Sequence, residues 1–114
     1  MPTKTVVYCT LQVEGAHNWA DCPIREVDYL RDRHRHIFHI KAYVPVYHDD
    51  RDVEFIEFKH TLKDFLHETY YDESSRMLEF GSRSCEMIAT QLMEQFKLCQ
   101  CEVSEDGENG AVLS

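Results

Sequence analysis

The alternation of apolar and polar residues is longest between residues 33 and 47. Its even-numbered side is formed by His34, His36, Phe38, Ile40, Ala42, Val44 and Val46. Because successive side chains of a strand point to opposite faces, this pattern predicts a strand with one apolar face. Two histidines continue that face at the N-terminal end of the strand, and two imidazoles on one strand face can bind one metal ion.

Three other segments have the composition of strands. Residues 4–13 are rich in β-branched and aromatic side chains, and residues 14–17 extend or end that strand. Residues 98–103 predict a third strand and residues 110–113 a short last one. The acidic, glycine-bearing turn at residues 104–109 would join these two strands as a hairpin.

Helical periodicity occurs twice, after the second predicted strand. From Lys59 to about Tyr70, apolar residues recur at three- and four-residue spacing, following a short hydrophobic approach at residues 53–58. A second helix is predicted from Ser84, whose hydroxyl can cap it. Residues 18–30 and 71–83 are predicted to be loops.

The predicted order is therefore β-β-α-α-β-β, in a single domain that spans residues 1–114. Strands first, helices next and strands last favour an α+β fold, with an antiparallel four-stranded sheet and two helices on one face. Such a sheet has exposed edges, which proteins usually cover or pair. We therefore expect a homo-oligomer.

Composition and charge exclude several classes of protein. The net charge of −9 disfavours nucleic-acid binding, and a hydrophobic fraction of 43% argues against disorder. The sequence lacks an apolar run long enough to cross a membrane and a signal-peptide core, so we expect a cytoplasmic protein without membrane contact. Five cysteines, an odd number without a regular framework, indicate free thiols in a reducing compartment.

Basic residues are concentrated beside the alternating strand. Arg31, Arg33 and Arg35 lie within a few residues of its two histidines. A local positive pocket in an acidic protein suits a small anionic ligand. The alternative is that these arginines only form a solvated face of the strand.

A third imidazole is available from His17, which ends the first predicted strand. If the first two strands are antiparallel neighbours, the end of one lies near the start of the other, so His17 can reach His34 and His36. Three neutral imidazoles leave one position of a tetrahedral zinc ion open, where zinc polarises a bound oxygen or acidifies a hydroxyl. A chain with seven histidines can also place three of them together by chance.

Five short segments carry a resemblance to a known family. They are Val13-Glu14-Gly15-Ala16-His17, His34-Arg35-His36-Ile37-Phe38, Phe55-Ile56-Glu57-Phe58, Ser84-Cys85-Glu86-Met87-Ile88-Ala89 and Val103-Ser104-Glu105. In this order they resemble the Ala-Ala-His, His-Gly-His-Asn-Tyr, Val-Val-Asp-Phe, Pro-Thr-Ser/Ala-Glu-Asn-Leu-Ala and late glutamate motifs of the 6-pyruvoyl-tetrahydropterin synthase and 6-carboxy-tetrahydropterin synthase family. The resemblance implies a tunnelling fold of order ββααββ. It also implies oligomerisation into a barrel, commonly a hexamer built as a dimer of trimers with active sites between subunits.

The resemblance implies roles for individual residues. His17, His34 and His36 match the three zinc ligands of the family, and Glu105 matches the glutamate that anchors the pterin ring. A carboxylate suits that role because it accepts two parallel N–H bonds from a guanidine-like ring edge. The alternative for Glu105 is an ordinary acidic turn residue.

The proton-transfer residues of the family are replaced in this chain. Leu30 stands at the position of its cysteine, and Cys22 in the same loop is either a geometric substitute or simply a structural thiol. The family's Asp-His pair after the first helix corresponds to Asp72 and Glu73. His67 is a further catalytic candidate or a surface residue of the helix.

Two functions are therefore expected. The first is a zinc-dependent, synthase-like lyase that acts on dihydroneopterin triphosphate or a related pterin, in the pterin or deazaguanine (queuosine) pathways, with the nearby arginines attracting the triphosphate. The second is a module that keeps a pocket for a pterin- or purine-like ligand but lacks synthase activity. The replaced cysteine favours the second function, and the three histidines favour the first.

Overall fold

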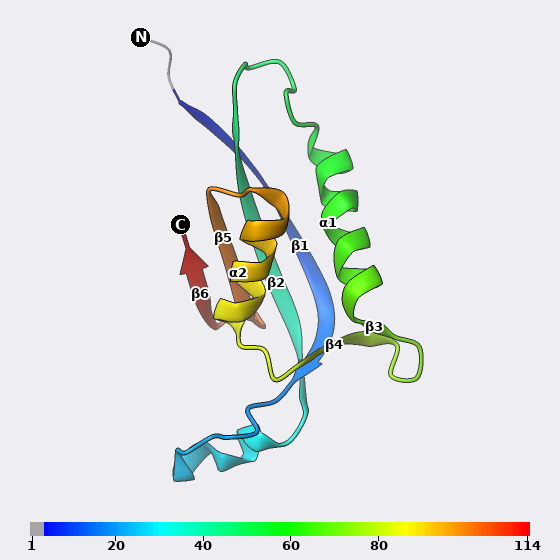
Figure 1. Cartoon of the computed structure of the whole chain (residues 1–114), viewed down its shortest axis with the longest axis vertical. Helices are drawn as coiled ribbons and strands as arrows, with labels where there is room; N and C mark the ends of the chain where they lie inside the picture. The colour runs from blue at the N-terminus through cyan, green and yellow to red at the C-terminus, as the bar shows by residue number, and fades with distance from the viewer. Residues whose placement is uncertain (1–3) are drawn as a thin grey trace.

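The computed structural model describes residues 4–114 as a six-stranded sheet with helices packed on one face (Figure 1). The strands are β1 (Thr5–His17), β2 (His34–Val46), β3 (Tyr71–Asp72), β4 (Met77–Gly81), β5 (Gln100–Glu105) and β6 (Asn109–Leu113). The helices are the 3-10 segment η1 (Arg25–Arg31), α1 (Phe55–Tyr70) and α2 (Cys85–Phe96). The strand order across the sheet is β3-β4-β1-β2-β5-β6.

The α+β fold is confirmed, but the sheet is larger than the predicted four-stranded antiparallel one. The four predicted strands pair antiparallel in the order β1-β2-β5-β6. The predicted loop at residues 71–83 instead contains the hairpin β3–β4, and β4 pairs parallel with β1. The sheet is therefore mixed. Leu78 and Phe80 of β4 are buried on one face of the strand. Their period-two pattern in the sequence is short, because it lies between polar residues and Gly81.

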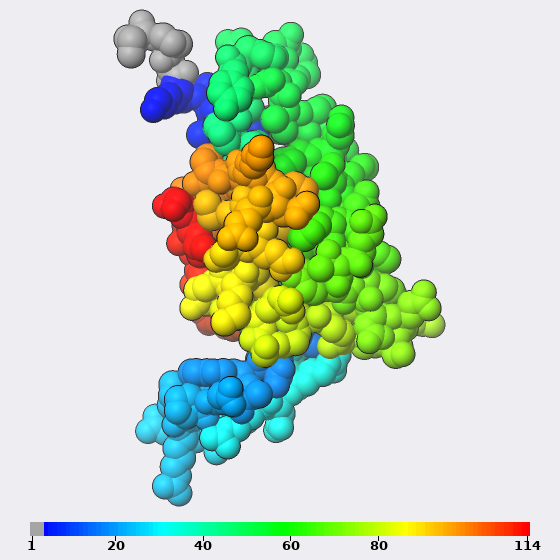
Figure 2. All heavy atoms as spheres, viewed as in Figure 1, coloured from blue at the N-terminus to red at the C-terminus, as the bar shows by residue number. Residues whose placement is uncertain are grey.

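The helices also differ from the prediction at their boundaries. Helix α1 begins at Phe55 rather than Lys59, because the carboxylate of Glu54 accepts a hydrogen bond from the backbone N–H of Glu57 and caps it. The predicted loop at residues 18–30 contains most of η1, and this part of the chain projects from the rest of the molecule (Figure 2), beyond the end of the sheet (Figure 1). No helix within residues 4–114 is long and apolar enough to cross a membrane.

One face of the sheet and the two long helices enclose the core. Its strand residues form rows across the sheet, each row made of residues that pair on neighbouring strands. Its helix residues come from both α1 and α2. The fully or nearly fully buried members include Cys9, Leu11, Phe38, Ile40, Ala42, Leu62, Leu66, Ile88, Leu92, Cys101 and Val103. Because the rows continue along the strands, whatever follows the last apolar row on this face lies directly against the core.

The row that follows contains histidines instead of aliphatic residues. Gly15 pairs with His36 and His17 pairs with His34, on the face that Phe38 shares. A side chain at Gly15 would meet the ring of Phe80 at 2.7 Å, so glycine leaves room for that ring under the histidines. The histidines therefore stand at the end of the core, on the helix-covered face.

The buried thiol of Cys101 makes the stability of the fold depend on alkaline pH. Burial first, and then the charge of Glu102, raises the pKa of this thiol from 9.0 to about 12. A raised pKa stabilises the fold fully below pH 9, and that stabilisation is lost as the pH rises toward 12, because only the unfolded chain ionises. Above pH 9, we expect this thiol to lower the free energy of unfolding by up to about 1.4 kcal/mol per pH unit.

Urea unfolding between pH 8 and pH 11 measures this slope. The variant Cys101→Val removes the thiol while keeping an apolar side chain of similar size, so its slope should be shallower. Equal slopes for the variant and the unmodified chain would contradict the prediction.

Candidate metal centre

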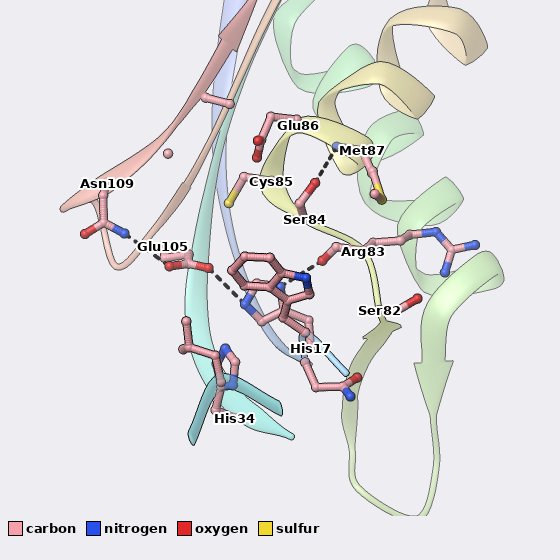
Figure 3. A pocket seen from close by; sticks show the side chains of 15 residues that line it. His17, His34, Ser82, Arg83, Ser84, Cys85, Glu86, Met87, Glu105 and Asn109 are labelled. Atoms are coloured by element: carbon pink, nitrogen blue, oxygen red, sulfur yellow. Dashed lines mark hydrogen bonds and ion pairs between the residues drawn. The ribbon is translucent and has the colours of Figure 1, made fainter. Parts of the chain in front are cut away.

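Four side chains converge at the end of the sheet, His17 from β1, His34 and His36 from β2 and Glu105 from β5. One potential ligand atom from each lies within 4.8 Å of the others. His17 is buried and the other three are half-buried. Figure 3 shows His17 and Glu105 pointing toward one another across the pocket that adjoins the cluster.

Two of the imidazoles are held in place by backbone carbonyls. His17 donates its Nδ1–H to the carbonyl oxygen of Arg83 at 2.8 Å, and His34 donates its Nδ1–H to that of Asp32 at 2.8 Å. A carbonyl only accepts, so both rings carry a proton on Nδ1, and in the neutral form of each ring the lone pair lies on Nε2. In metal sites such outer hydrogen bonds fix the tautomer and the ring orientation.

The third imidazole is held by a carboxylate. The Nδ1–H of His36 donates to Oδ2 of Asp106 at 2.8 Å, while Oδ1 of Asp106 accepts from the backbone N–H of Ile37 at 2.9 Å. The bond from Ile37, followed by the one from His36, lowers the pKa of Asp106. Asp106 is therefore ionised near neutral pH, and His36 also presents its Nε2 lone pair to the cluster.

The position of Glu105 completes a donor set for a metal ion. Its Oε2 lies 2.9 Å from Nε2 of His17 and 3.7 Å from Nε2 of His36. These distances bracket the separation of about 3.3 Å between neighbouring ligand atoms of a tetrahedral zinc ion. Three nitrogen donors and one carboxylate oxygen are an ordinary ligand set for zinc.

The contact between His17 and Glu105 is one that a shared metal ion would satisfy. It is short enough for an ion pair but lacks hydrogen-bond geometry, so the buried Nε2 of His17 has no hydrogen-bond partner among residues 4–114. In the neutral ring, which carries its proton on Nδ1, a lone pair on Nε2 faces a carboxylate oxygen. Two acceptors at this distance repel one another, and a bound metal ion would satisfy both.

A pocket of about 630 Å³ opens beside the cluster. Its walls come from the segment after β1, the first turn of α2 and the β5–β6 hairpin. They include His17, Trp19, Leu30, His34, Ser84, Cys85, Glu86, Met87, Glu105 and Asn109 (Figure 3). A molecule in this pocket would therefore lie within reach of a metal ion at the cluster.

Neither thiol near the pocket is suited to proton transfer. Cys22 is fully buried in the segment after β1, with Sγ 3.7 Å from the carbonyl oxygens of Ile24 and Val27, and it does not line the pocket. Leu30 does line it. Cys85 lines the pocket too, but burial first, then Glu105 and Glu86, raises the pKa of its thiol to about 12.

The other proton-transfer candidates lie away from the pocket of the same chain. His67 is exposed near the C-terminal end of α1 and stacks on Tyr71 with ring centres 4.2 Å apart. Asp72 accepts a hydrogen bond from the backbone of Ser74, and Glu73 is exposed in the β3–β4 turn. None of these three candidates lines the pocket.

Three residues of the site were not singled out from the sequence. Asp106 orients the imidazole of His36. Cys85, at the start of α2, and Trp19, in the segment after β1, line the pocket. The sequence offers one signal for Asp106, a carboxylate directly after Glu105 at a turn that returns toward His36. The same position fits an ordinary acidic turn, so the sequence alone did not distinguish the two roles.

No protein-family model matches this chain, and a search of curated proteins found no significant similarity. The structure nevertheless shows an α+β sheet domain with a cluster of three histidines and a glutamate that could hold a metal ion. All four residues of the cluster belong to one chain.

The hydrogen bond from His36 to Asp106 predicts a measurable loss of metal affinity when it is weakened. Replacing Asp106 with asparagine keeps the shape but removes the charge, and we expect zinc affinity to fall by about 10- to 100-fold. Competition with a chromophoric chelator measures this. Glu108→Gln, an exposed change in the same turn, serves as the control, and equal affinities for the two variants would contradict the assignment.

Proposed function

We propose that this chain binds one zinc ion through His17, His34, His36 and Glu105 and holds a pterin- or purine-like ring in the adjoining pocket. The convergence of three Nε2 lone pairs, each with its Nδ1 fixed by an outer acceptor, carries the proposal. Such preorganisation of neutral imidazoles is typical of metal sites. The motif resemblance to the tetrahydropterin synthase family supports both the metal and the ligand class.

Each group near the ligand has a distinct role in this proposal. A zinc ion held by these four residues would act as a Lewis acid toward a ligand oxygen by expanding to five-coordination. Glu105 faces both the cluster and the pocket, and its Oε1 accepts a hydrogen bond from Asn109 at 3.1 Å. Its carboxylate can accept N–H groups of a ring edge, while Trp19 offers an aromatic surface on another wall.

The pocket of a single chain favours binding over synthase turnover. Proton transfer at a pterin side chain needs a group of suitable pKa within reach of the reacting atoms. Leu30 occupies the wall where the resemblance places a cysteine, and Cys22 is enclosed elsewhere. We therefore propose a zinc-dependent binding module as the function that the geometry supports best.

The enzyme alternative is favoured by a different observation. Asp72, Glu73 and His67 lie on or near the surface around the C-terminal end of α1, where a neighbouring copy could receive them. In an oligomeric barrel, these groups would serve the pocket of the next subunit. This form of the proposal requires a homo-oligomer, such as a hexamer, and light scattering that gives a monomer would exclude it.

Metal analysis combined with a turnover assay tests the proposal. The binding module predicts one zinc per chain, binding of neopterin and no product from dihydroneopterin triphosphate. The single tryptophan, Trp19, lines the pocket, so quenching of its fluorescence reports ligand binding. Product formation would establish the enzyme alternative instead, and the absence of zinc would overturn both.

A further inference from the structure

The two arginines that flank His34 form ion pairs with glutamates on the outer surface of the sheet. The guanidinium of Arg33 donates to both carboxylate oxygens of Glu79, at 2.8 Å and 2.5 Å. Arg35 forms an ion pair with Glu14. Neither arginine lines the pocket. The expectation that these side chains create a positive pocket is therefore wrong, and the alternative of a solvated strand face describes them.

The two remaining arginines near the site also point elsewhere. Arg31 donates from Nε and Nη2 to the carbonyl oxygen of Cys22, at 3.0 Å and 2.7 Å. Arg83 is the only arginine or lysine among residues 4–114 that lines the pocket. Its guanidinium lies over the ring of Tyr70, donates to the carbonyl oxygen of Phe80 and points away from His17 (Figure 3).

The N-terminus of α2, which also borders the pocket, is capped at one of its backbone N–H groups and carries a carboxylate in its first turn. Helix N-termini attract anions through their free backbone N–H groups and the helix dipole. Here the hydroxyl of Ser84 accepts from the backbone N–H of Met87 at 3.2 Å, and the carboxylate of Glu86 lies in the first turn. A phosphate arriving at this helix would therefore meet a partly capped N-terminus and the carboxylate of Glu86.

The charged groups that do line the pocket near the cluster are therefore mainly acidic. Glu86 from α2 and Glu105 from β5 contribute two negative charges, which a divalent ion at the cluster would about balance. Neither carboxylate can donate a charge-assisted hydrogen bond to a triphosphate, which carries several negative charges.

Building on the proposed function, we infer that the ligand of this pocket carries no phosphate chain. The structure favours an uncharged or protonated nitrogen heterocycle whose N–H groups face the carboxylates of Glu86 and Glu105. That ligand would then be the product of a dephosphorylating or glycosidic-cleavage reaction rather than a nucleotide triphosphate. This departs from the substrate that the motif resemblance implies.

Two probes that share one ring test the inference. Neopterin and neopterin triphosphate are titrated into the zinc-loaded full chain, free of excess zinc, with Trp19 fluorescence as the readout. We expect neopterin to bind at least about tenfold more tightly at low salt, with the difference narrowing as salt screens the charges. Tighter binding of the triphosphate would overturn this inference and leave the proposed function intact.

A charge variant identifies the source of the selectivity. Glu86→Gln removes one pocket carboxylate and should strengthen triphosphate binding by roughly three- to tenfold relative to neopterin, as expected for one partly screened charge. Glu94→Gln, an exposed change on the same helix outside the pocket, should leave the ratio unchanged. An unchanged ratio in Glu86→Gln would overturn the inference.

Failure of both probes to bind a chain that retains one zinc would overturn the inference together with the ligand assignment, but not the metal site.

Discussion

Replacement of His17 by alanine is expected to reduce bound zinc from one equivalent per chain to less than about a tenth of an equivalent, because a structural zinc site depends on its full donor set. His17 is the most buried donor of the cluster, and its Nε2 faces Glu105 directly. The loss removes one imidazole and leaves that carboxylate without its nearest neighbour. Elemental analysis after desalting in the presence of a weak chelator measures the zinc content.

A second histidine offers a matched control for this experiment. His48 is a surface residue that pairs with Asp52 at 3.2 Å, away from the cluster. His48→Ala should retain one equivalent of zinc. If His17→Ala retained as much zinc as His48→Ala, the cluster would not be the binding site.

Replacement of Phe38 by alanine is expected to lower the free energy of unfolding by about 3–5 kcal/mol, the usual range for removing a fully buried phenylalanine. Phe38 is completely buried, and its ring lies 4.9 Å from that of Phe80. It also contacts the rings of His17 and His36, at 5.2 Å and 5.7 Å between centres. The cavity would therefore open directly under the metal cluster.

Urea unfolding in the presence of a chelator isolates this packing effect from metal binding. Tyr47→Ala provides the control, because Tyr47 is 90% exposed and surface changes usually alter stability by less than about 0.5 kcal/mol. A loss of under about 1 kcal/mol for Phe38→Ala would contradict the assigned core.

The sequence allowed the part of the site that depends on strand periodicity to be predicted. Alternation placed His34 and His36 on the face of Phe38, and antiparallel pairing of the first two strands predicted His17 within reach of both; the structure pairs it with His34. These relations follow from local rules, since one residue of register error would move every histidine to the other face. The proximity of the three imidazoles therefore followed from the register.

Features that depend on distant partners could not be predicted in the same way. β3 and β4 are short, and β4 becomes a strand by pairing in parallel with the end of β1, 60 or more residues earlier in the chain. Asp106 reaches His36 only because the β5–β6 turn folds back over the start of β2. The engagement of Arg33 by Glu79 likewise depends on β4, so the charge of the pocket could not be inferred from a cluster of arginines.

X-ray absorption at the zinc edge tests the metal centre most directly. On protein loaded with one equivalent of zinc, the account predicts four nitrogen or oxygen ligands at about 2.0–2.1 Å, with the outer-shell scattering of three imidazoles. The Glu105→Gln variant should change the light-atom shell and leave the imidazole signal in place. A sulfur shell near about 2.3 Å, or a shell without imidazole scattering, would contradict a site built from His17, His34, His36 and Glu105.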